Sequence, residues 1–364
     1  MQAEMKVPGD TTRYRLPPEW VPHRATWLSY PHAAGTWPGG IENIMASYNE
    51  FVRIVSTGEA VHIHVQDAES ARRVGAALAA AGAVMANIVL HEVPTNDAWC
   101  RDHGPCFVFA DGAARKVIIN WGFNSWGGKY PFALDAMVPS RVAGLLGLPM
   151  VEPGLIMEGG SIEVNGAGSL LTTESCLLNP NRNPQCSRGD IEAALRLYYG
   201  VGQVIWLGEG IAGDDTDGHV DDITRFVSET RVVTAVEEDP SDANHAPLQH
   251  NLERLRTVRL PGGRPLEVIE LPMPEPVYHR GQRLPASYAN FYICNAAVVM
   301  PTFRCGRDAA AQAILQRCFD RPVIGIDSCD IIQGLGSFHC LSRQEPASDI
   351  RNGQPKDTQE GAGT

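Results

Sequence analysis

Apolar and polar residues recur along this chain as a repeating unit of two short apolar strands, an amphipathic helix and a further apolar strand. Paired strands are expected at 105–110 with 116–120, 161–165 with 169–173, 219–227 with 231–236 and 289–293 with 297–301, and a last pair begins near Ser337. Helices are expected at 135–146, 188–199, 244–256 and 307–319, and later strands at 203–207, 266–271 and 323–327. The N-terminal segment fits the scheme, with strands at 25–29 and 61–65 around a helix near 42–56. The pattern predicts a mixed α/β fold.

The spacing of polar residues at the hairpin starts supports a repeat. Asp102 and Glu158 are 56 residues apart, Glu158 and His219 are 61 apart, His219 and Asn290 are 71 apart, and Asn290 and Cys340 are 50 apart. Periods of this size are typical of units arranged about an axis. If the units close into a ring, these residues converge on one central pocket. An open α/β sheet built from the same elements is the alternative.

Composition and charge narrow the classes of partner. Of the 364 residues, 44% are hydrophobic and 20% are charged, as expected of a folded protein with a substantial core. The formal net charge of −12 argues against nucleic acid, whose backbone selects Lys and Arg, and suits a small cationic substrate. The nine cysteines form no CxxC pair, residues 1–15 lack an apolar signal core, and no 18-residue apolar run occurs. We therefore expect a cytoplasmic protein with free thiols and no membrane partner.

The segment 214–227 is the densest in candidate chemistry. His219 and Asp221 stand two residues apart at the expected start of a strand, so both side chains would share one face, roughly 6–7 Å apart. An imidazole beside a carboxylate is suited to proton transfer. The acids Asp214, Asp215 and Asp217 that precede this pair could attract a cationic substrate.

The same segment has some features of a calcium loop and of a zinc site. Aligning Gly218 with the central glycine of a calcium loop puts Gly213 and Thr224 where acids are required, so that reading fails. A zinc site that joins His219 to the pair at 339–340 is conceivable, but the chain has neither HExxH nor paired-cysteine spacing. We expect no metal.

Further polar groups lie at the other hairpin starts. In the stretch 96–105, the ring of Trp99 could contact the face of a flat cation while the carboxylate of Asp102 accepts hydrogen bonds from its edge. The alternative is that this stretch is a solvated loop without a ligand. Glu158 precedes two glycines, which permit a close backbone approach or a simple turn. The rigid polar stretch 178–184 is expected to be a structural turn.

One cysteine, Cys340, follows a glycine-rich bend and is the candidate nucleophile. A lone cysteine is most often an inert core residue. Only the histidine and carboxylates elsewhere in the chain favour Cys340 as a nucleophile. Its neighbour His339 would point to the opposite face of a strand, so we expect His339 to be structural.

Taken together, the motifs resemble the agmatine deiminase family, which includes bacterial peptidylarginine-deiminase-like proteins. The resemblance covers roughly 17–346 and rests on the segments 18–28, 36–39, 96–105, 158–162, 177–184, 216–221, 287–293 and 339–340, in the family's order. It implies the pentein fold, a five-bladed α/β propeller with pseudo-fivefold ββαβ repeats around a central active site. Residues 1–346 would then form a single catalytic domain, and the polar stretch 347–364 is expected to be a disordered tail.

The resemblance also implies a reaction: hydrolysis of the guanidinium of agmatine to N-carbamoylputrescine and ammonia, in putrescine and polyamine synthesis. The resemblance implies that Cys340 is the nucleophile and that His219 acts first as general acid and then as general base. Asp102 and Asp221 would bind the nitrogens of the guanidinium, and Glu158 would belong to the catalytic residues. Trp99 would contact the face of the cation, and Asn290 would bind substrate. No cofactor is needed, and the family suggests a homo-oligomer.

Two departures from the family pattern flank the candidate nucleophile. The stretch Gly334–Cys340 stands where agmatine deiminases usually have Gly-Gly-Gly-Asn-Ile-His-Cys, and Ser342–Glu345 replaces a usual Thr-Gln-Gln pattern. Because these changes flank the expected pocket, the sequence does not identify the residues that contact the end of the substrate distal to the guanidinium. The alternatives are a deiminase of free or peptidyl arginine, an amidinotransferase, a silent guanidine- or polyamine-binding protein and a metal-dependent hydrolase.

Overall fold

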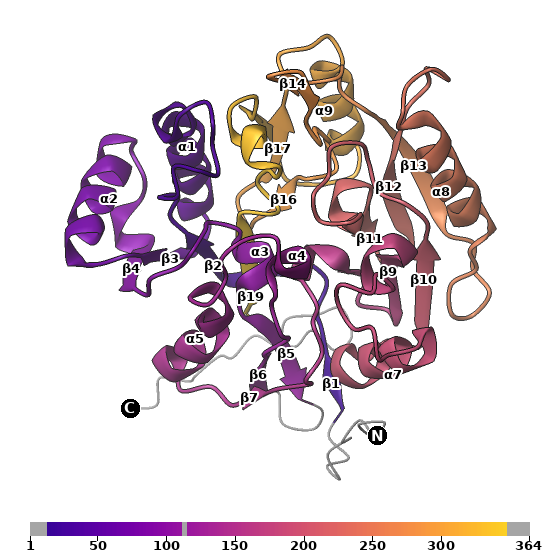
Figure 1. Cartoon of the computed structure of the whole chain (residues 1–364), viewed down its shortest axis with the longest axis horizontal. Coiled ribbons are helices and arrows are strands. Elements are labelled where there is room, and N and C mark those ends of the chain that lie inside the picture. The colour runs from indigo at the N-terminus through magenta and orange to yellow at the C-terminus, as the bar shows by residue number, and fades with distance from the viewer. Residues whose placement is uncertain (1–12, 111–114, 348–364) are drawn as a thin grey trace, which may run out of the picture.

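The computed structural model describes residues 13–110 and 115–347 (Figure 1). Apart from Ala347, the predicted tail at 347–364 lies outside the described residues. Helices and strands alternate through the described chain, which confirms the mixed α/β class. Within these ranges no helix is both long and apolar enough to cross a membrane.

Five sheets share one connection pattern, in which an antiparallel pair is followed by a helix and a parallel strand. The sheets are β1 (Tyr14–Arg15), β5 (Cys106–Ala110), β6 (Arg115–Ile119) and β7 (Met150–Val151); β8 (Glu163–Val164), β9 (Ser169–Thr173) and β10 (Gln203–Leu207); β11 (Thr224–Ser228), β12 (Arg231–Val236) and β13 (Glu267–Pro272); β16 (Tyr292–Ile293), β17 (Val298–Thr302) and β18 (Val323–Asp327); and β19 (Ser342–Pro346), β2 (His23–Ser29), β3 (Ala60–Val65) and β4 (Ile88–Glu92). The repeat predicted from the pattern is therefore present.

The longer helices lie toward the outside of the molecule, and the sheets spread around its middle (Figure 1). These helices are α1 (Met45–Ser56), α2 (Ala68–Ala80), α5 (Val138–Leu146), α7 (Arg188–Tyr199), α8 (His245–Thr257) and α9 (Asp308–Gln316). Apolar side chains fill the space between helix and sheet, as where Phe51 and Val55 of α1 join Val61 and Ile63 of β3 in one buried cluster. Each such side chain contributes about 1.5–3 kcal/mol on burial.

The helix α7 illustrates why local sequence was sufficient for several elements. Ser187 caps it by accepting from the backbone of Asp190, whose side chain returns the bond to Ser187. Gly200 ends it in the left-handed region, at φ 71°. The predicted span 188–199 is thereby confirmed, as are the strands at 203–207 and 323–327.

The first and last parts of the chain complete one sheet between them. Strand β19 pairs antiparallel with β2, with Ser342 opposite Leu28 and Glu345 opposite Ala25. The strand pair predicted near Ser337 thus begins later and finds its partner at the N-terminus. The last described strand therefore belongs to the same sheet as β2, near the start of the described chain.

Several elements were not predicted from the sequence, among them α2, β4 and a short hairpin. Helix α2 buries only Val74 and Leu78, so its apolar periodicity is weak. Strand β4 lies at a sheet edge and has no fully buried residue. The hairpin of β14 (Tyr278–His279) and β15 (Gln282–Arg283) is too short to show alternation.

The strand start predicted at His219 is wrong. His219 instead precedes a short 3-10 helix, η5 (Val220–Asp222), and β11 begins at Thr224. Val220 and Ile223 are both fully buried, and a hydrogen bond from the Ile223 N–H to the Val220 carbonyl closes the turn. The turn places His219 Nδ1 4.0 Å from Asp221 Oδ1.

Candidate active site

A cavity of about 290 Å³ opens at the middle of the molecule. Its walls include Trp99, Asp102, Trp126, Cys340 and the hairpin residue Gln282. The cavity therefore reaches three of the residues that the sequence predicted to act together: Trp99, Asp102 and Cys340.

The remaining predicted residues lie next to this cavity, and each comes from the start of a different unit. Asp102 lies in the short helix α3 (Cys100–His103), Glu158 precedes the turn η4 (Gly159–Ser161), His219 and Asp221 flank η5, Asn290 precedes β16, and Cys340 lies in the turns before β19. All of them are buried. The convergence expected from the repeat spacing is thus observed.

Two carboxylates, Asp102 and Asp221, are held by fixed donors. Asp102 accepts from the Gly160 N–H at 2.9 Å and from Trp126 Nε1 at 3.0 Å. Asp221 Oδ2 is 2.6 Å from His339 Nδ1, whereas the buried Asp221 Oδ1 has no hydrogen-bond partner. A free, buried carboxylate oxygen of this kind calls for a donor from a ligand.

Their protonation differs because their surroundings differ. Burial raises the pKa of Asp102, and the charges of Asp221 and Glu158 add to this against the opposing effect of His219. Burial also disfavours charge on Asp221, but the hydrogen bond with His339 and the charges of His339, His219 and Arg225 together outweigh it and lower the pKa of Asp221. The pKa values of the two carboxyl groups therefore shift in opposite directions, and a cation bound between them would favour the charged form of both.

His219 is completely buried among three carboxylates. Its Nδ1 is 3.8 Å from Asp102 Oδ1 and 4.0 Å from Asp221 Oδ1, and its Nε2 is 3.7 Å from Glu158 Oε2. Burial opposes the imidazolium, but Asp102 and the other neighbours outweigh it and raise the pKa of His219 well above its ordinary value. The surrounding carboxylates therefore favour the imidazolium form of His219, whose Nδ1 faces Asp102 and Asp221.

Cys340 Sγ lies at the cavity floor and is held from behind by Asn290. Asn290 Nδ2 donates to Sγ at 3.0 Å, and its Oδ1 accepts from the N–H groups of Ser337, His339 and Cys340 at 3.1–3.3 Å. Asn290 does not reach the cavity wall; it contacts Cys340 rather than the space for a ligand. Burial, and then the charge of Asp221, raise the pKa of the Cys340 thiol well above its ordinary value.

The expectation that His339 points away from the site as a strand residue is wrong. Cys340 and His339 lie in turns, because β19 begins only at Ser342. His339 Nδ1 bonds Asp221, and its Nε2 is 2.8 Å from Glu19 Oε2. Glu19 was not predicted as a site residue, although it lies in the N-terminal segment that carries the family resemblance.

Glu19 anchors a buried ionic network behind the site. It pairs with Arg101 and Arg225, each at 3.0 Å, and Arg225 also bonds Glu163 at 3.1 Å. Burial disfavours the charge, but Arg225, His339 and Arg101 lower the pKa of Glu19 well below its ordinary value. The network fixes the orientation of His339 and, through it, of Asp221.

The turn 178–184 is structural, as predicted, but it also supports the site. The side chain of Arg182 is fully buried and donates from Nε to Glu158 Oε1 at 2.6 Å. Its other nitrogens donate to Asp217 Oδ2 at 2.6 Å and to the Thr216 carbonyl at 2.8 Å. Arg182 therefore locks Glu158 to the loop that leads into His219.

The acids that precede His219 have separate partners. Asp214 accepts from the N–H groups of Thr216 and Gly218 and shapes the loop, and Asp217 is paired with Lys129 as well as Arg182. Only Asp215 of the three lines the cavity.

Aromatic rings and glycines shape the cavity beside Cys340. A Cβ on Gly336 would lie 2.7 Å from the Trp99 ring and 2.9 Å from Cys340 Cβ, so only glycine fits there. Trp126, which bonds Asp102, has a left-handed backbone at φ 55°. Such strain costs about 1–3 kcal/mol and is typical of functional sites.

Gly160 gives a direct test of how tightly the site is packed. A Cβ there would lie 2.5 Å from His219 Nδ1 and 3.0 Å from Asp221 Oδ2. We expect Gly160→Ala to lower the free energy of unfolding by about 1–3 kcal/mol, because the site must be pushed apart. Chemical denaturation measures this. In the control Gly144→Ala, on the exposed side of α5 with no atom within 4 Å, stability should instead rise by about 0.5–1 kcal/mol; equal behaviour of the two variants would contradict the packing described.

Comparisons with known proteins agree on one family. Residues 15–346 match the sequence model of the family described as Porphyromonas-type peptidyl-arginine deiminase. The chain is 36% identical over 361 residues to an agmatine deiminase of Ectopseudomonas mendocina, covering 92% of this chain and 96% of that one. Among solved structures, a cysteine-to-serine variant of C. jejuni agmatine deiminase with substrate bound has a TM-score of 0.83 at 31% identity, covering 93% of this chain and 97% of that one. An agmatine deiminase of Enterococcus faecalis has a TM-score of 0.84 at 29% identity, covering 92% and 96%.

Proposed function

The chain belongs to the Porphyromonas-type peptidyl-arginine deiminase family, and on that premise we propose that it hydrolyses the guanidinium of agmatine to N-carbamoylputrescine and ammonia. The observation that carries the proposal is the convergence of a cysteine thiol, an imidazolium and two carboxylates around one buried spot at the end of a cavity. The agmatine deiminases among its relatives support the choice of substrate.

Asp102 and Asp221 would hold the guanidinium. Both are buried, and the unpaired Asp221 Oδ1 is an acceptor for its N–H groups. A guanidinium carbon is a poor electrophile because three nitrogens share its charge, so fixing its plane above a nucleophile is a large part of the catalysis. Trp99 would cover one face of the cation.

Cys340 would be the nucleophile, and the cation itself would activate it. Burial, and then the charges of Asp221, Asp222 and Asp102, favour the protonated thiol and raise the pKa of Cys340. A guanidinium between Asp102 and Asp221 offsets their charge, so the thiol proton can leave to solvent and the thiolate can form. Asn290 would assist, because its Nδ2 donates to Sγ.

The reaction then has two halves. The thiolate attacks the guanidinium carbon, His219 gives its proton to the departing nitrogen, and ammonia leaves an S-amidino cysteine. Neutral His219 next takes a proton from water, the hydroxide adds to the same carbon, and the adduct expels the Cys340 thiolate as the ureido product forms. Glu158 faces Nε2 of His219 and would stabilise its imidazolium.

The charge of the cavity wall favours agmatine over free arginine. Among the described residues that line it, Asp97, Asp102 and Asp215 are acidic and none is Lys or Arg, although Asp215 is paired with Lys129 at 3.2 Å. The primary ammonium of agmatine would be attracted by these carboxylates, whereas the α-carboxylate of arginine would be repelled by them.

Replacing Asp221 by Asn tests the guanidinium seat. We expect the Asp221→Asn variant to lose mainly kcat, because the carboxylate matters most as charge moves in the transition state. Steady-state ammonia release over a range of agmatine concentrations separates kcat from KM. In the control Asp214→Asn the altered acid shapes the loop without lining the cavity, so a smaller loss is expected. An effect of Asp221→Asn confined to KM would contradict the assigned role.

The five sheets are described above as separate units, and their arrangement in space is a further part of the proposal. We propose that they are the blades of a pentein propeller, with residues 1–346 as one catalytic domain. The meeting of β19 and β2 in one sheet supports ring closure, since it joins the last unit to the first. A cytoplasmic location, a homo-oligomeric state and a place in putrescine synthesis belong to the same proposal.

A further inference from the structure

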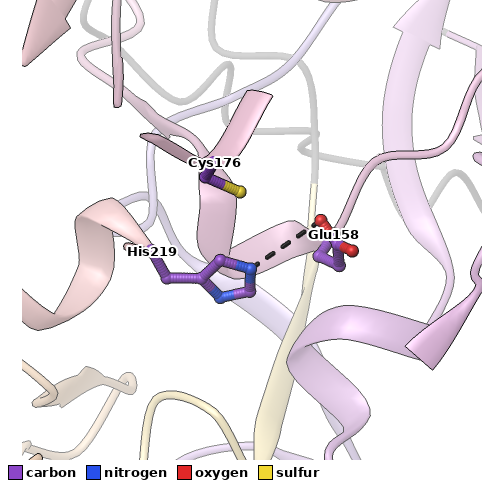
Figure 2. Close-up of side chains that lie close together, drawn as sticks. All are labelled: Glu158, Cys176 and His219. Atoms are coloured by element: carbon purple, nitrogen blue, oxygen red, sulfur yellow. Dashed lines mark ion pairs between the residues drawn. The ribbon is translucent and has the colours of Figure 1, made fainter. Parts of the chain in front are cut away.

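A second cluster of ligating atoms lies behind His219, on the side away from the carboxylate pair. Glu158, Cys176 and His219 each offer one atom there, and these atoms all lie within 4.8 Å of one another (Figure 2). All three residues are completely buried. The mechanism proposed above gives no role to Cys176.

Two of the three atoms lack any hydrogen-bond partner. Glu158 Oε2 and His219 Nε2 are buried and face each other at 3.7 Å, which is within ion-pair distance but too long for a hydrogen bond, while Arg182 holds the other oxygen of Glu158. Unpaired buried polar atoms are uncommon and costly, so two that face each other beside a thiol indicate a place for a ligand.

The backbone holds the cluster in position from both sides. Cys176 lies in the short helix α6 (Glu174–Leu177), and its N–H donates to Thr173 Oγ1 at 3.3 Å. The same hydroxyl donates to the carbonyl of Gly218 at 2.5 Å, directly before His219. The thiol and the imidazole are therefore fixed relative to each other by one side chain.

We propose that this cluster binds a thiophilic divalent cation of the zinc class, and that its occupation inhibits the enzyme. A thiolate, an imidazole and a carboxylate are a typical zinc donor set, with water free to take the fourth position. Ligand atoms around tetrahedral zinc are about 3.3–3.8 Å apart, so Glu158 and His219 already have a suitable separation. Binding releases the Cys176 thiol proton and the proton on His219 Nε2 to solvent. The ion would enter from the cavity past Asp102, 3.8 Å from His219.

The inhibition follows from which nitrogen the cation takes. An ion on Nε2 prevents the ring from holding a second proton, so His219 could no longer act as an acid at Nδ1. The guanidinium seat between Asp102 and Asp221 would stay open, and inhibition would be noncompetitive with substrate. This consequence rests on the proposed role of His219, whereas cation binding does not.

A second group of residues is an alternative site for the cation, and the test must distinguish the two. Asp221, Asp222 and Cys340 also bring ligating atoms within 4.8 Å of one another. A cation there would occupy the nucleophile and compete with substrate. The two sites can be separated by which cysteine is required.

The binding test uses Co²⁺ titrated into the substrate-free protein, because a thiolate bound to cobalt gives a charge-transfer absorption band. The wild type and Cys340→Ala should show the band with equal affinity, and Cys176→Ser should lose it and bind about 10–100-fold more weakly. Cys294→Ser is the matched control, a buried cysteine whose Sγ bonds only the Ala297 carbonyl, and should behave as wild type. No band in the wild type, or a band that depends on Cys340, would overturn the site.

The inhibition test uses Zn²⁺ in the ammonia assay. Zinc should lower kcat without raising KM, and the inhibition constant should rise at least about tenfold in Cys176→Ser relative to that variant's own uninhibited rate. Competitive inhibition, or equal inhibition of the wild type and Cys176→Ser, would reject the inhibitory role. Since the cobalt band needs no turnover, an inactive protein that still shows the band would refute the proposed function and leave the cation site standing.

Discussion

Replacing Cys340 by Ala should reduce ammonia release from agmatine by about a million-fold, to the limit of detection. No other described thiol lines the cavity, so nothing can take over the attack on the guanidinium carbon. The substitution removes only Sγ and leaves both carboxylates in place, so the variant should still bind agmatine. Steady-state ammonia release and calorimetric binding measure the two effects separately.

Cys294→Ser again provides the control for this prediction. It alters a buried cysteine that packs in the core, far along the chain from the carboxylates, and should keep wild-type turnover. If Cys340→Ala released ammonia at the wild-type rate, Cys340 would not be the nucleophile. If the variant lost turnover and binding together while remaining folded, the assignment of substrate binding to the carboxylates would be wrong.

His219→Gln should lower kcat by about 10²–10⁴-fold. Glutamine fills a similar volume but cannot hold and release a proton near neutral pH. Both halves of the reaction should slow, since the same ring serves as acid and then as base. The wild-type rate should fall as the pH rises through the raised pKa of His219, because the acid form is then lost, and this limb should be absent in the variant.

The matched control for His219→Gln is His245→Gln. His245 lies at the start of α8, where its Nδ1 bonds the Glu237 carbonyl, and glutamine can replace that bond. This variant should keep both the wild-type rate and the wild-type pH profile. A His219→Gln enzyme with an unchanged profile would show that another group carries the proton.

Much of the fold was predictable because apolar runs and caps act locally. Strands β10 and β18 match the prediction, and α7 begins and ends at its cap residues. The family predicted from the motifs is confirmed. The start of β11 was wrong because a turn anchored by Val220 and Ile223 replaces the strand, and periodicity alone does not distinguish the two.

The reactive residues of the site were predictable from the sequence, but the residues that orient them were not. Asp102, His219 and Cys340 stand out as unusual residue types at hairpin starts. Glu19 and His339 do not, because they are 320 positions apart in the chain and form an ion pair only after folding. Asn290 was expected to bind substrate; its side chain contacts Cys340, and its part in substrate binding stays a prediction.

The most direct test of the central claim is ammonia release by the purified wild-type protein from agmatine, free arginine and a blocked arginine peptide, with product analysis. The account predicts ammonia from agmatine in equal amounts with N-carbamoylputrescine, and far slower release from the other two. Ammonia from arginine or the peptide in preference to agmatine would contradict the assigned substrate, and silence on all three would contradict the assigned reaction.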